Sequence, residues 1–258
     1  MSTNMYGSTA KAISHYKDKQ KFTETPNFGG KLFCRTLSEA SKKMCNFGVV
    51  IYAKNFLMTE KEKMLRQMIY DANNDTDLIE ERKVAKDLCY TFNQLRPSDT
   101  AEQQQLMRRL LGKTAGDSFC IVAPFWCDYG YNIEIGENFF ANHNTVILDG
   151  AKVKFGNNVF VAPNCGFHTA GHPIDAERRN QGLEYAYPII VGDNVWIGAG
   201  VQVMPGVTIG SNVVIGGGSV VVKDIPSNVV AVGNPCRVVR QITDEDKLKS
   251  WDRTYVEK

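Results

Sequence analysis

A six-residue hydrophobic repeat dominates the second half of the sequence. From Val191 the chain reads VGDNVW, IGAGVQ, VMPGVT, IGSNVV, IGGGSV and VVKDIP, and each block opens with Val or Ile. Further blocks of this kind begin at Ile135, Ala141, Ile147, Phe155 and Val161. An amphipathic helix repeats its apolar positions every three to four residues and a half-buried strand every two, so neither fits. The pattern predicts short strands separated by tight turns, three to a coil of about 18 residues, whose stacking buries a column of aliphatic side chains.

Two interruptions break this repeat. The step from Ile147 to Phe155 is eight residues, so two residues are inserted at that turn. The step from Phe167 to Val191 is 24 residues where the repeat requires six, so about 18 residues are extra, in a polar loop that reads HTAGHPIDAERRNQGLEYAYP. Polar loops that project from a rigid scaffold commonly carry binding and catalytic groups. We therefore expect functional residues in the longer insertion.

Residues 58–113 show a helical pattern instead. Thr59 and Glu62 have the spacing of a capping box, and a turn at residues 97–99 precedes a further helix. The predicted first helix presents the apolar stripe Met64, Leu65, Met68 and Ile69. A second helix, at about residues 77–93, is expected to bury Leu78, Val84, Ala85, Leu88, Cys89 and Phe92. The third is expected to bury Leu106, Leu110 and Leu111. These residues are assigned to packing.

The chain divides into four predicted sections. Residues 1–57 form a basic extension without sustained periodicity, interpreted as disordered, as a mitochondrial transit peptide, or as sequence upstream of a start codon at Met58. Residues 58–113 form the helical section and 114–240 the repeat domain. Residues 241–258 form a C-terminal tail, in which a short helix is expected after Thr243, with Asp246 in a capping position.

Composition excludes several function classes. The 258 residues include 30 Lys and Arg against 28 Asp and Glu, a net charge of +2, which is too balanced to indicate a nucleic-acid-binding protein. The apolar runs are far shorter than the roughly 18 residues that a membrane-spanning helix needs. The seven Cys are odd in number and lack paired spacing, so we expect no disulfide framework and a cytoplasmic location.

Several motifs resemble the maltose/galactoside O-acetyltransferase family of hexapeptide-repeat proteins. They are CDYGYNI at 127–133, FFAN at 139–142, TAGHPID at 169–175, DNVWIG at 193–198, GVTIG at 206–210, KDIP at 223–226 and GNPCR at 233–237. The resemblance covers about residues 58–240. It implies a mainly β fold, a left-handed parallel β-helix with an N-terminal helical section and a projecting loop. It further implies a homotrimer that transfers acetyl from acetyl-CoA to a hydroxyl of a small sugar or glycoside.

The catalytic chemistry needs a base, because an alcohol loses its proton only as it attacks the thioester. Histidine titrates nearest to neutral pH, and His172 lies in the longer insertion. The resemblance implies that His172 is this base and that it returns the proton to the CoA thiolate. It also implies that Asn142 supports the transition state, whereas a corner Asn could instead satisfy its own coil. The backbone N–H of Ala199 is the implied oxyanion donor.

The resemblance also implies an acceptor site. Asp128 and Glu184 would accept hydrogen bonds from sugar hydroxyls, and Trp196 would form an aromatic wall unless it is a core residue. An Asp of the galactoside enzymes would fall on position 150, which is Gly150 here, so a maltose- or glucose-like acceptor is favoured over a galactoside. One further acceptor contact is expected within residues 73–75, from a residue that the sequence does not identify.

Coenzyme A is a long anionic donor, so its site should combine backbone amides with cations. By resemblance the pantetheine slot is lined by Ala199, Gly217 and Val222, and the adenine end and phosphates by Lys223, Arg237 and Arg240. No metal site is expected, because His143 and His168 occupy different positions of their blocks and should not stack with each other. Three alternatives remain: an amine or non-sugar alcohol as acceptor, a non-catalytic assembly protein, and a metal-dependent hydratase.

Overall fold

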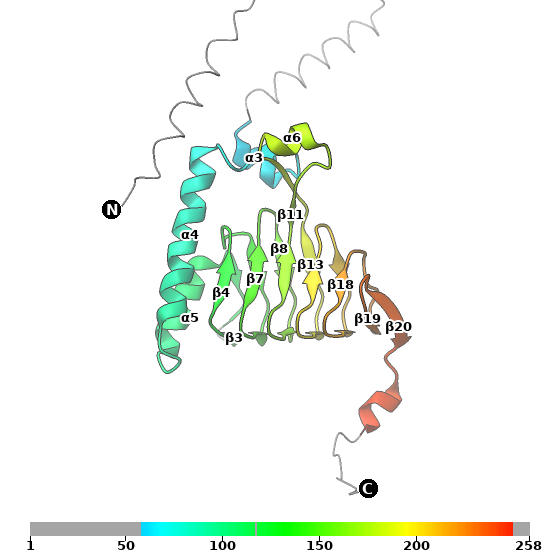
Figure 1. Ribbon diagram of the computed structural model, residues 1–258. Helices are drawn as coiled ribbons and strands as arrows, with labels where there is room; N and C mark the ends of the chain where they lie inside the picture. The colour runs from blue at the N-terminus through cyan, green and yellow to red at the C-terminus, as the bar shows by residue number, and fades with distance from the viewer. Residues whose placement is uncertain (1–57, 117, 250–258) are drawn as a thin grey trace, which may run out of the picture. The chain divides into compact units, whose positions relative to one another are not determined.

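Stacked coils of short parallel strands form most of the protein, as the repeat predicts (Figure 1). The computed structural model describes residues 58–116 and 118–249, so the predictions for residues 1–57 and 250–258 lie outside the described residues. The division of the chain into four sections stays a prediction. The mainly β architecture, a parallel β-helix with helices before it, is confirmed.

The coils present three faces, each a sheet of strands from successive coils. The β6 face comprises, in spatial order, β20 (Arg237–Gln241), β19 (Val229–Val232), β17 (Val213–Ile215), β14 (Val195–Ile197), β9 (Phe160–Val161), β6 (Phe139–Ala141) and β3 (Phe119–Ile121). The β7 face comprises β18 (Val220–Val221), β15 (Gln202–Val203), β10 (Gly166–His168), β7 (Thr145–Leu148) and β4 (Phe125–Cys127). The β8 face comprises β16 (Thr208–Ile209), β13 (Ile189–Val191), β8 (Val153–Phe155), β5 (Ile133–Ile135) and β2 (Lys113–Thr114).

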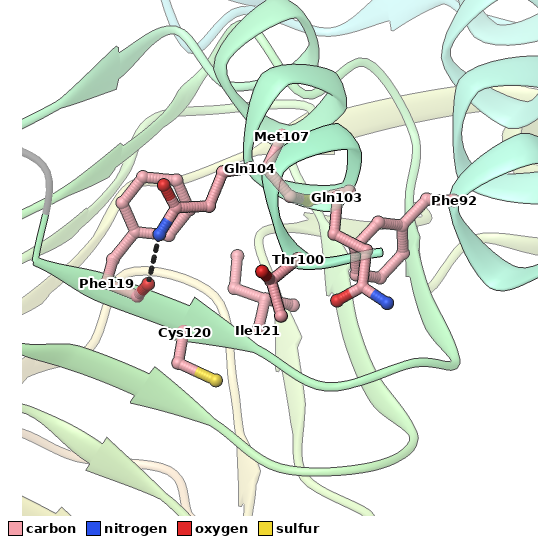
Figure 2. A pocket seen from close by; sticks show the side chains of 8 residues that line it. All are labelled: Phe92, Thr100, Gln103, Gln104, Met107, Phe119, Cys120 and Ile121. Carbon is pink, nitrogen blue, oxygen red and sulfur yellow. Dashed lines mark hydrogen bonds between the residues drawn. The ribbon is translucent and has the colours of Figure 1, made fainter. Parts of the chain in front are cut away.

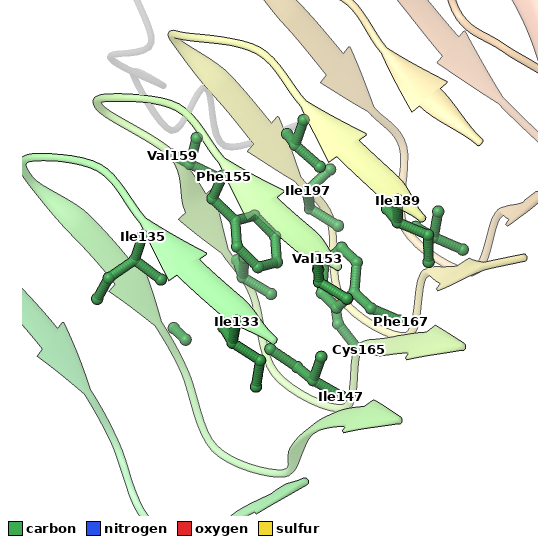
Figure 3. Close-up of a cluster of buried hydrophobic side chains, with 14 of the residues drawn as sticks. Ile133, Ile135, Ile147, Val153, Phe155, Val159, Cys165, Phe167, Ile189 and Ile197 are labelled. Carbon is green, nitrogen blue, oxygen red and sulfur yellow. The ribbon is translucent and has the colours of Figure 1, made fainter. Parts of the chain in front are cut away.

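Alternation within each three-residue strand explains the buried column. The first and third residues of β14 are buried and its middle residue, Trp196, is exposed. Figure 3 shows the inward-pointing side chains gathered from several coils. They include Ile133, Ile147, Phe155, Phe167 and Ile197, each no more than 2% exposed. Removing these apolar surfaces from water is the main stabilising contribution to the stack.

Asparagines mark the corner between the β8 and β6 faces. Asn138, Asn158, Asn194, Asn212 and Asn228 have φ between 53° and 64°, a left-handed conformation that Asn adopts more readily than most residues. Side-chain bonds link several successive corners, for example Asn158 Nδ2 to Asn194 Oδ1 at 2.9 Å across 36 residues. In the unbroken repeat, neighbouring corners are about 18 residues apart. The additional 18 residues between Asn158 and Asn194 are those of the longer insertion, and the two corners still stack as neighbours.

Two helices, α4 (Thr76–Gln94) and α5 (Thr100–Leu110), close one end of the stack (Figure 1). The short helix α3 (Glu60–Leu65) precedes them and lies beside the longer insertion. Asn93 ties α4 to the first coil, because its Nδ2 donates to the carbonyl of Phe125 at 3.0 Å and its Oδ1 accepts the N–H of Phe125 at 2.8 Å. Leu106 and Leu110 of α5 join the same core as the coil residues. No helix among the described residues is long and apolar enough to cross a bilayer.

The first two helices differ in part from expectation. The capping box of Thr59 and Glu62 is present, but α3 ends at Leu65, and Gln67 has φ 59°. The predicted stripe therefore does not continue to Met68 and Ile69, and Leu65 is 53% exposed. On α4, Val84 was expected to be buried but is 61% exposed. The buried stripe follows Leu78, Ala85, Cys89 and Phe92, and Val84 lies outside it.

The longer insertion is itself structured. It contains β11 (Ala170–Gly171), α6 (Ala176–Asn180) and β12 (Leu183–Ala186). β12 pairs antiparallel with both β11 and the short strand β1 (Tyr70–Asp71). The loop is therefore held by the helical section as well as by its own coil. The opposite end of the stack is closed by β20, which runs antiparallel to β19, and the predicted C-terminal helix is a 3₁₀ turn at Asp244–Leu248.

The turn between β7 and β8, which is two residues longer than the repeat requires, contains a buried carboxylate at Asp149, which is 0% exposed. Its Oδ1 accepts the backbone N–H groups of Asp128 at 3.1 Å and Tyr129 at 2.8 Å, and its Oδ2 accepts the N–H of Asn132 at 3.3 Å. Burial raises the pKa of Asp149 to about 6, and the charge of Asp128 adds to this increase. One side chain therefore holds the turn that follows β4.

Replacing Asp149 with Asn tests this arrangement. An amide offers one acceptor oxygen instead of two, so at least one N–H group of the turn loses its partner, which costs about 1–3 kcal/mol of stability. The folded-state pKa of about 6 lies above the ordinary 3.8, so the folded protein retains a proton that the unfolded chain loses between these values. The wild type thus becomes less stable as pH rises through this window.

The variant lacks this titration. Its deficit in unfolding free energy, measured by urea denaturation, should be larger at about pH 4.5 than at about pH 7. Asp193→Asn is the control, because the exposed Asp193 carboxylate also accepts a backbone N–H, that of Asn157 at 2.7 Å, and its loss should cost less. A deficit that is equal at both pH values would contradict the role given to Asp149.

Candidate functional site

His172 follows β11 in the longer insertion, and its side chain is exposed. Its Nδ1 lies 3.0 Å from the backbone carbonyl of Leu183. A carbonyl oxygen only accepts hydrogen bonds, so Nδ1 carries the proton and the neutral ring keeps its lone pair on Nε2. A Cβ at the neighbouring Gly171 would lie 2.5 Å from the ring of Tyr185, so only glycine allows this close approach of β11 to β12. Nε2 of His172 makes no hydrogen bond within the part of the chain that the structure describes, so its lone pair is available.

Glu184 lies on β12 directly opposite Tyr70 of β1. The Tyr70 hydroxyl donates to Glu184 Oε2 at 3.0 Å, and Asn73 Nδ2 lies 3.4 Å from Oε1. Asn73 also donates to the carbonyl of Gly182 at 2.8 Å. Among residues 73–75, Asn73 is therefore the one that reaches the insertion, a contact that the sequence did not identify. Tyr70 was missed as well, because a lone Tyr after a helix carries no recognisable signal.

Asp128 is half-buried in the turn that Asp149 holds. Burial raises the pKa of its carboxyl, the positive charges of Lys86 and Arg82 oppose this, and the negative charge of Glu184 adds to it. The two carboxylates therefore share one electrostatic environment. Arg82, a residue that sequence reasoning did not single out, donates to the hydroxyl of Tyr129 at 2.7 Å.

Asn142 and Trp196 line a different hollow, of about 490 Å³, together with Phe140, Phe160, Val161 and Ala162. Trp196 is 56% exposed, which excludes the interpretation of it as a core residue. Asn142 Oδ1 accepts the N–H of His143 at 2.8 Å, and Asn142 Nδ2 makes no hydrogen bond within the described residues. The side-chain oxygen of Asn142 is therefore used within its own coil, whereas its Nδ2 group remains available as a hydrogen-bond donor.

The predicted residues fall into two groups on either side of the β7 face. Asp128, His172, Glu184, Val222 and Lys223 follow strands of the β7 face, at the corner that leads to the β8 face. The second group lies at the opposite corner, on or after strands of the β6 face, and contains Asn142, Trp196, Ala199 and Gly217. Each group lies along one edge of the stack, with Asp128 and Lys223 at the two ends of their edge, and the two groups are on opposite sides of the β7 face within one chain.

The predicted phosphate-binding cations differ in their partners. Arg240 forms a two-pronged ion pair with Asp246, at 2.7 and 2.8 Å. Arg237 donates to the carbonyl of Cys236 at 2.8 Å, and within the described residues neither Arg237 nor Lys223 forms an ion pair. Both are exposed. Arg237 and Lys223 are therefore free to meet an anion, whereas Arg240 is already engaged.

One further hollow and two histidine contacts involve none of the residues predicted to form the site. A hollow of about 140 Å³ between α5 and β3 is lined by Met107, Phe119 and Cys120 among others, with Gln104 bonded to the carbonyl of Phe119 (Figure 2). His168 Nε2 contacts Gln202 Oε1 at 2.8 Å, and His143 contacts the carbonyl of Ala123. Within residues 58–116 and 118–249, no group of three or more His, Cys, Asp or Glu is placed to hold a metal ion.

Two family models match the chain. One is described as the maltose acetyltransferase hexapeptide capping motif and matches residues 63–116, which include α4 and α5. The other is described as the bacterial transferase hexapeptide in six repeats and matches residues 188–223. The first model corresponds to the helices that close the stack, and the second to the longest unbroken part of the repeat.

Known proteins resemble the chain over most of their own lengths. It is 59% identical to a Saccharomyces cerevisiae protein assigned provisionally as an acetyltransferase, over 72% of this chain and 94% of that protein. A maltose O-acetyltransferase from Clostridium difficile 630 is 51% identical with a TM-score of 0.70, covering 72% of this chain and 99% of that one. A galactoside acetyltransferase in complex with coenzyme A is 42% identical with a TM-score of 0.71, covering 78% and 100%.

These similarities extend through the helices, the repeat and the longer insertion alike. The sequence motifs, the two matching family models and the solved structures agree on the class of enzyme, an acetyltransferase of hexapeptide-repeat architecture. The protein belongs to the maltose/galactoside O-acetyltransferase family.

Proposed function

We propose that the protein transfers the acetyl group of acetyl-CoA to a hydroxyl of a small sugar or glycoside, with a maltose- or glucose-like acceptor favoured over a galactoside. The observation that carries the proposal is the contact of His172 Nδ1 with the carbonyl of Leu183, which leaves Nε2 unprotonated in the neutral ring. The use of acetyl-CoA is supported by related structures that hold coenzyme A or acetyl-CoA.

In the proposed reaction His172 Nε2 takes the proton of the acceptor hydroxyl as its oxygen attacks the thioester carbonyl. The C–O bond forms, the carbonyl oxygen becomes an oxyanion, and the backbone N–H of Ala199 and the amide of Asn142 stabilise it. Collapse of this intermediate breaks the C–S bond. The protonated His172 then returns its proton to the CoA thiolate, which regenerates the neutral base.

Acceptor and cofactor would each contact residues from both groups described above. Asp128 and Glu184 accept hydrogen bonds from acceptor hydroxyls, and Trp196 supplies a flat apolar wall. Gly150 offers no carboxylate at the position where galactoside enzymes have one, which supports the preference for other sugars. Ala199, Gly217 and Val222 line the pantetheine of acetyl-CoA. Lys223, Arg237 and Arg240 lie toward its phosphates, with Arg240 the weakest contributor because of its ion pair with Asp246.

We further propose that the active enzyme is a homotrimer. His172 and Asn142 lie at opposite corners of the β7 face, so a complete site requires the Asn142 corner of one subunit to meet the His172 corner of the next. The exposed Phe160 and Trp196 provide an apolar surface for that contact. We place the enzyme in the cytoplasm, in keeping with the five unpaired Cys of the described residues.

Replacing His172 with Ala should lower kcat for acetyl transfer at least about 100-fold, because general-base catalysis contributes roughly 10²–10⁴. Binding of acetyl-CoA should persist. The measurement is CoA thiol release against a panel of glucose, maltose, a galactoside, an amino sugar and a non-sugar alcohol. His143→Gln is the matched control, because His143 also contacts a carbonyl through Nδ1 and should keep its turnover.

The outcomes of this panel separate the alternatives. Turnover that survives in His172→Ala would exclude His172 as the base. Transfer to the amine alone would replace the sugar hydroxyl with an amine as acceptor. Absence of acetyl-CoA binding in the wild type would leave an assembly protein as the better interpretation.

Replacing Lys223 or Arg237 with Ala should raise the KM for acetyl-CoA about five- to tenfold and change kcat by less than about twofold, because a charge-assisted contact to phosphate would be lost. Arg240→Ala should have a smaller effect. Lys83→Ala, which removes an exposed cation of α4 paired with Glu80, is the control. Steady-state kinetics with acetyl-CoA as the varied substrate measure these effects, and an unaltered KM would remove Lys223 and Arg237 from the cofactor site.

Replacing Phe160 with Glu should prevent trimer formation, because a charge would be buried in an apolar contact. Light scattering should give the wild type three times the monomer mass of 28.8 kDa and the variant the mass of one monomer. The variant should also lose acetyl transfer. Val84→Glu changes an equally exposed apolar residue on α4 and should leave the mass unchanged. A monomeric wild type with full activity would refute the composite site.

A further inference from the structure

Tyr70 is the buried partner of the proposed acceptor-binding residue Glu184. It is 1% exposed, although its hydroxyl reaches a half-buried carboxylate. The two residues face each other across the antiparallel pair of β1 and β12, with 3.0 Å between the phenol oxygen and Glu184 Oε2. Burial and the charge of Glu184 raise the pKa of Tyr70 well above its ordinary value, so the phenol stays protonated and remains a donor.

The absence of a side chain at Gly150 makes room for this phenol. A Cβ at position 150 would lie 2.9 Å from the Tyr70 hydroxyl and 3.3 Å from Cβ of Ala186. Gly150 and Asp149 are neighbours in the lengthened turn between β7 and β8, and Asp149 holds the turn that carries Asp128. The turn between β7 and β8 therefore holds Asp128 through the side chain of Asp149. At Gly150 it leaves room for Tyr70, which bonds Glu184.

Glu184 retains capacity for a ligand in this arrangement. A carboxylate accepts about four hydrogen bonds, and within the described residues Tyr70 and Asn73 supply two. The N–H of Asp128 bonds to Asp149, and the next residue, Gly150, adjoins the Tyr70 hydroxyl that donates to Glu184, so the chain of contacts places both carboxylates at the same corner. In keeping with this, the charge of Glu184 raises the pKa of the Asp128 carboxyl, and the positive charges of Lys86 and Arg82 oppose it. Two adjacent carboxylates with free lone pairs suit an acceptor that presents two hydroxyls.

We propose that Tyr70 is a positioning residue that sets acceptor specificity, by holding the Glu184 carboxylate beside Asp128 so that the pair accepts hydrogen bonds from two hydroxyls of one neutral sugar. This inference rests on the proposed function. Tyr70 does not touch the acceptor and acts through Glu184. The geometry also requires position 150 to lack a side chain, because any Cβ there would meet the phenol.

A double-mutant cycle tests the proposal. Tyr70→Phe removes the hydroxyl and keeps the ring, and Glu184→Gln keeps the shape of the acceptor-binding side chain without its charge. Both single variants and the double variant are assayed as full chains with the best sugar of the panel and with acetyl-CoA. Tyr131→Phe is the matched control, because Tyr131 packs in the same cluster and donates to Glu81 at 2.7 Å, away from Glu184.

Tyr70→Phe is expected to raise the KM for the sugar about five- to tenfold, as the loss of a hydrogen bond to a charged group would, and to leave the KM for acetyl-CoA unchanged. In the Glu184→Gln background the same substitution should change the sugar KM less than about twofold. Tyr131→Phe should change neither KM. The unaltered KM for acetyl-CoA also shows that each variant is folded.

Three results would overturn the proposal: an unchanged sugar KM in Tyr70→Phe, equal shifts in the KM values of both substrates, or fully additive effects in the double variant. Acceptor-dependent thiol release by the wild type distinguishes these three results from failure of the proposed function. If it releases no acceptor-dependent thiol with any sugar, the proposed function falls and this inference falls with it. If it acetylates sugars and the cycle is additive, only the role of Tyr70 is refuted.

Discussion

Burial of one aliphatic side chain at the start of each six-residue block is the constraint on which the structure depends. Each strand is only two to five residues long and could not persist alone, so its stability comes from the coils above and below it. Fixed stacking keeps every corner at the same edge of the β-helix. Residues far apart in sequence, such as Asp128, His172 and Lys223, are gathered along one edge for this reason.

The site therefore combines a rigid part with a supported loop. Corner residues such as Asn142 and Ala199 inherit their positions from the stack. The loop that carries His172 and Glu184 cannot rely on the stack, and it is held instead by pairing of β12 with β1 and by the Tyr70 and Asn73 contacts. The helical section thus has two roles, closing the core and fixing the loop. This explains why helices and repeat occur together in the same chain.

Most of the fold could be predicted from the sequence, because a six-residue period has few physical solutions. The stack, the two insertions and the capping box at Thr59 follow from local pattern alone. Burial of individual helix residues was less predictable. Val84 is as apolar as its buried neighbours, and only the direction from which the first coil approaches α4 decides that it faces outward. Likewise Met68 and Ile69 leave the predicted stripe because β1 forms instead, through pairing with a strand more than 110 residues later.

The site was predictable where motifs are contiguous, as around His172, and less so where contacts are long-range. Nothing local indicates that Asp149 holds the turn at Asp128, or that Tyr70 reaches Glu184. The division of the predicted residues between two corners of the β7 face was also not visible in the sequence, because it depends on which face each strand joins. The roles of His172, Asn142 and the cofactor residues stay predictions.

The two ends of the stack have a consequence for the behaviour of the protein in solution. A parallel coil that ended on a bare strand would expose unpaired N–H and C=O groups, and a second molecule could add its own first coil to that edge. Here α4 and α5 cover the first coil, and β20 reverses direction against β19, with a bulge between Val230 and Ala231. On the β6 face the last parallel strand is therefore covered by an antiparallel one, which leaves no flat parallel edge there for a coil of a second molecule.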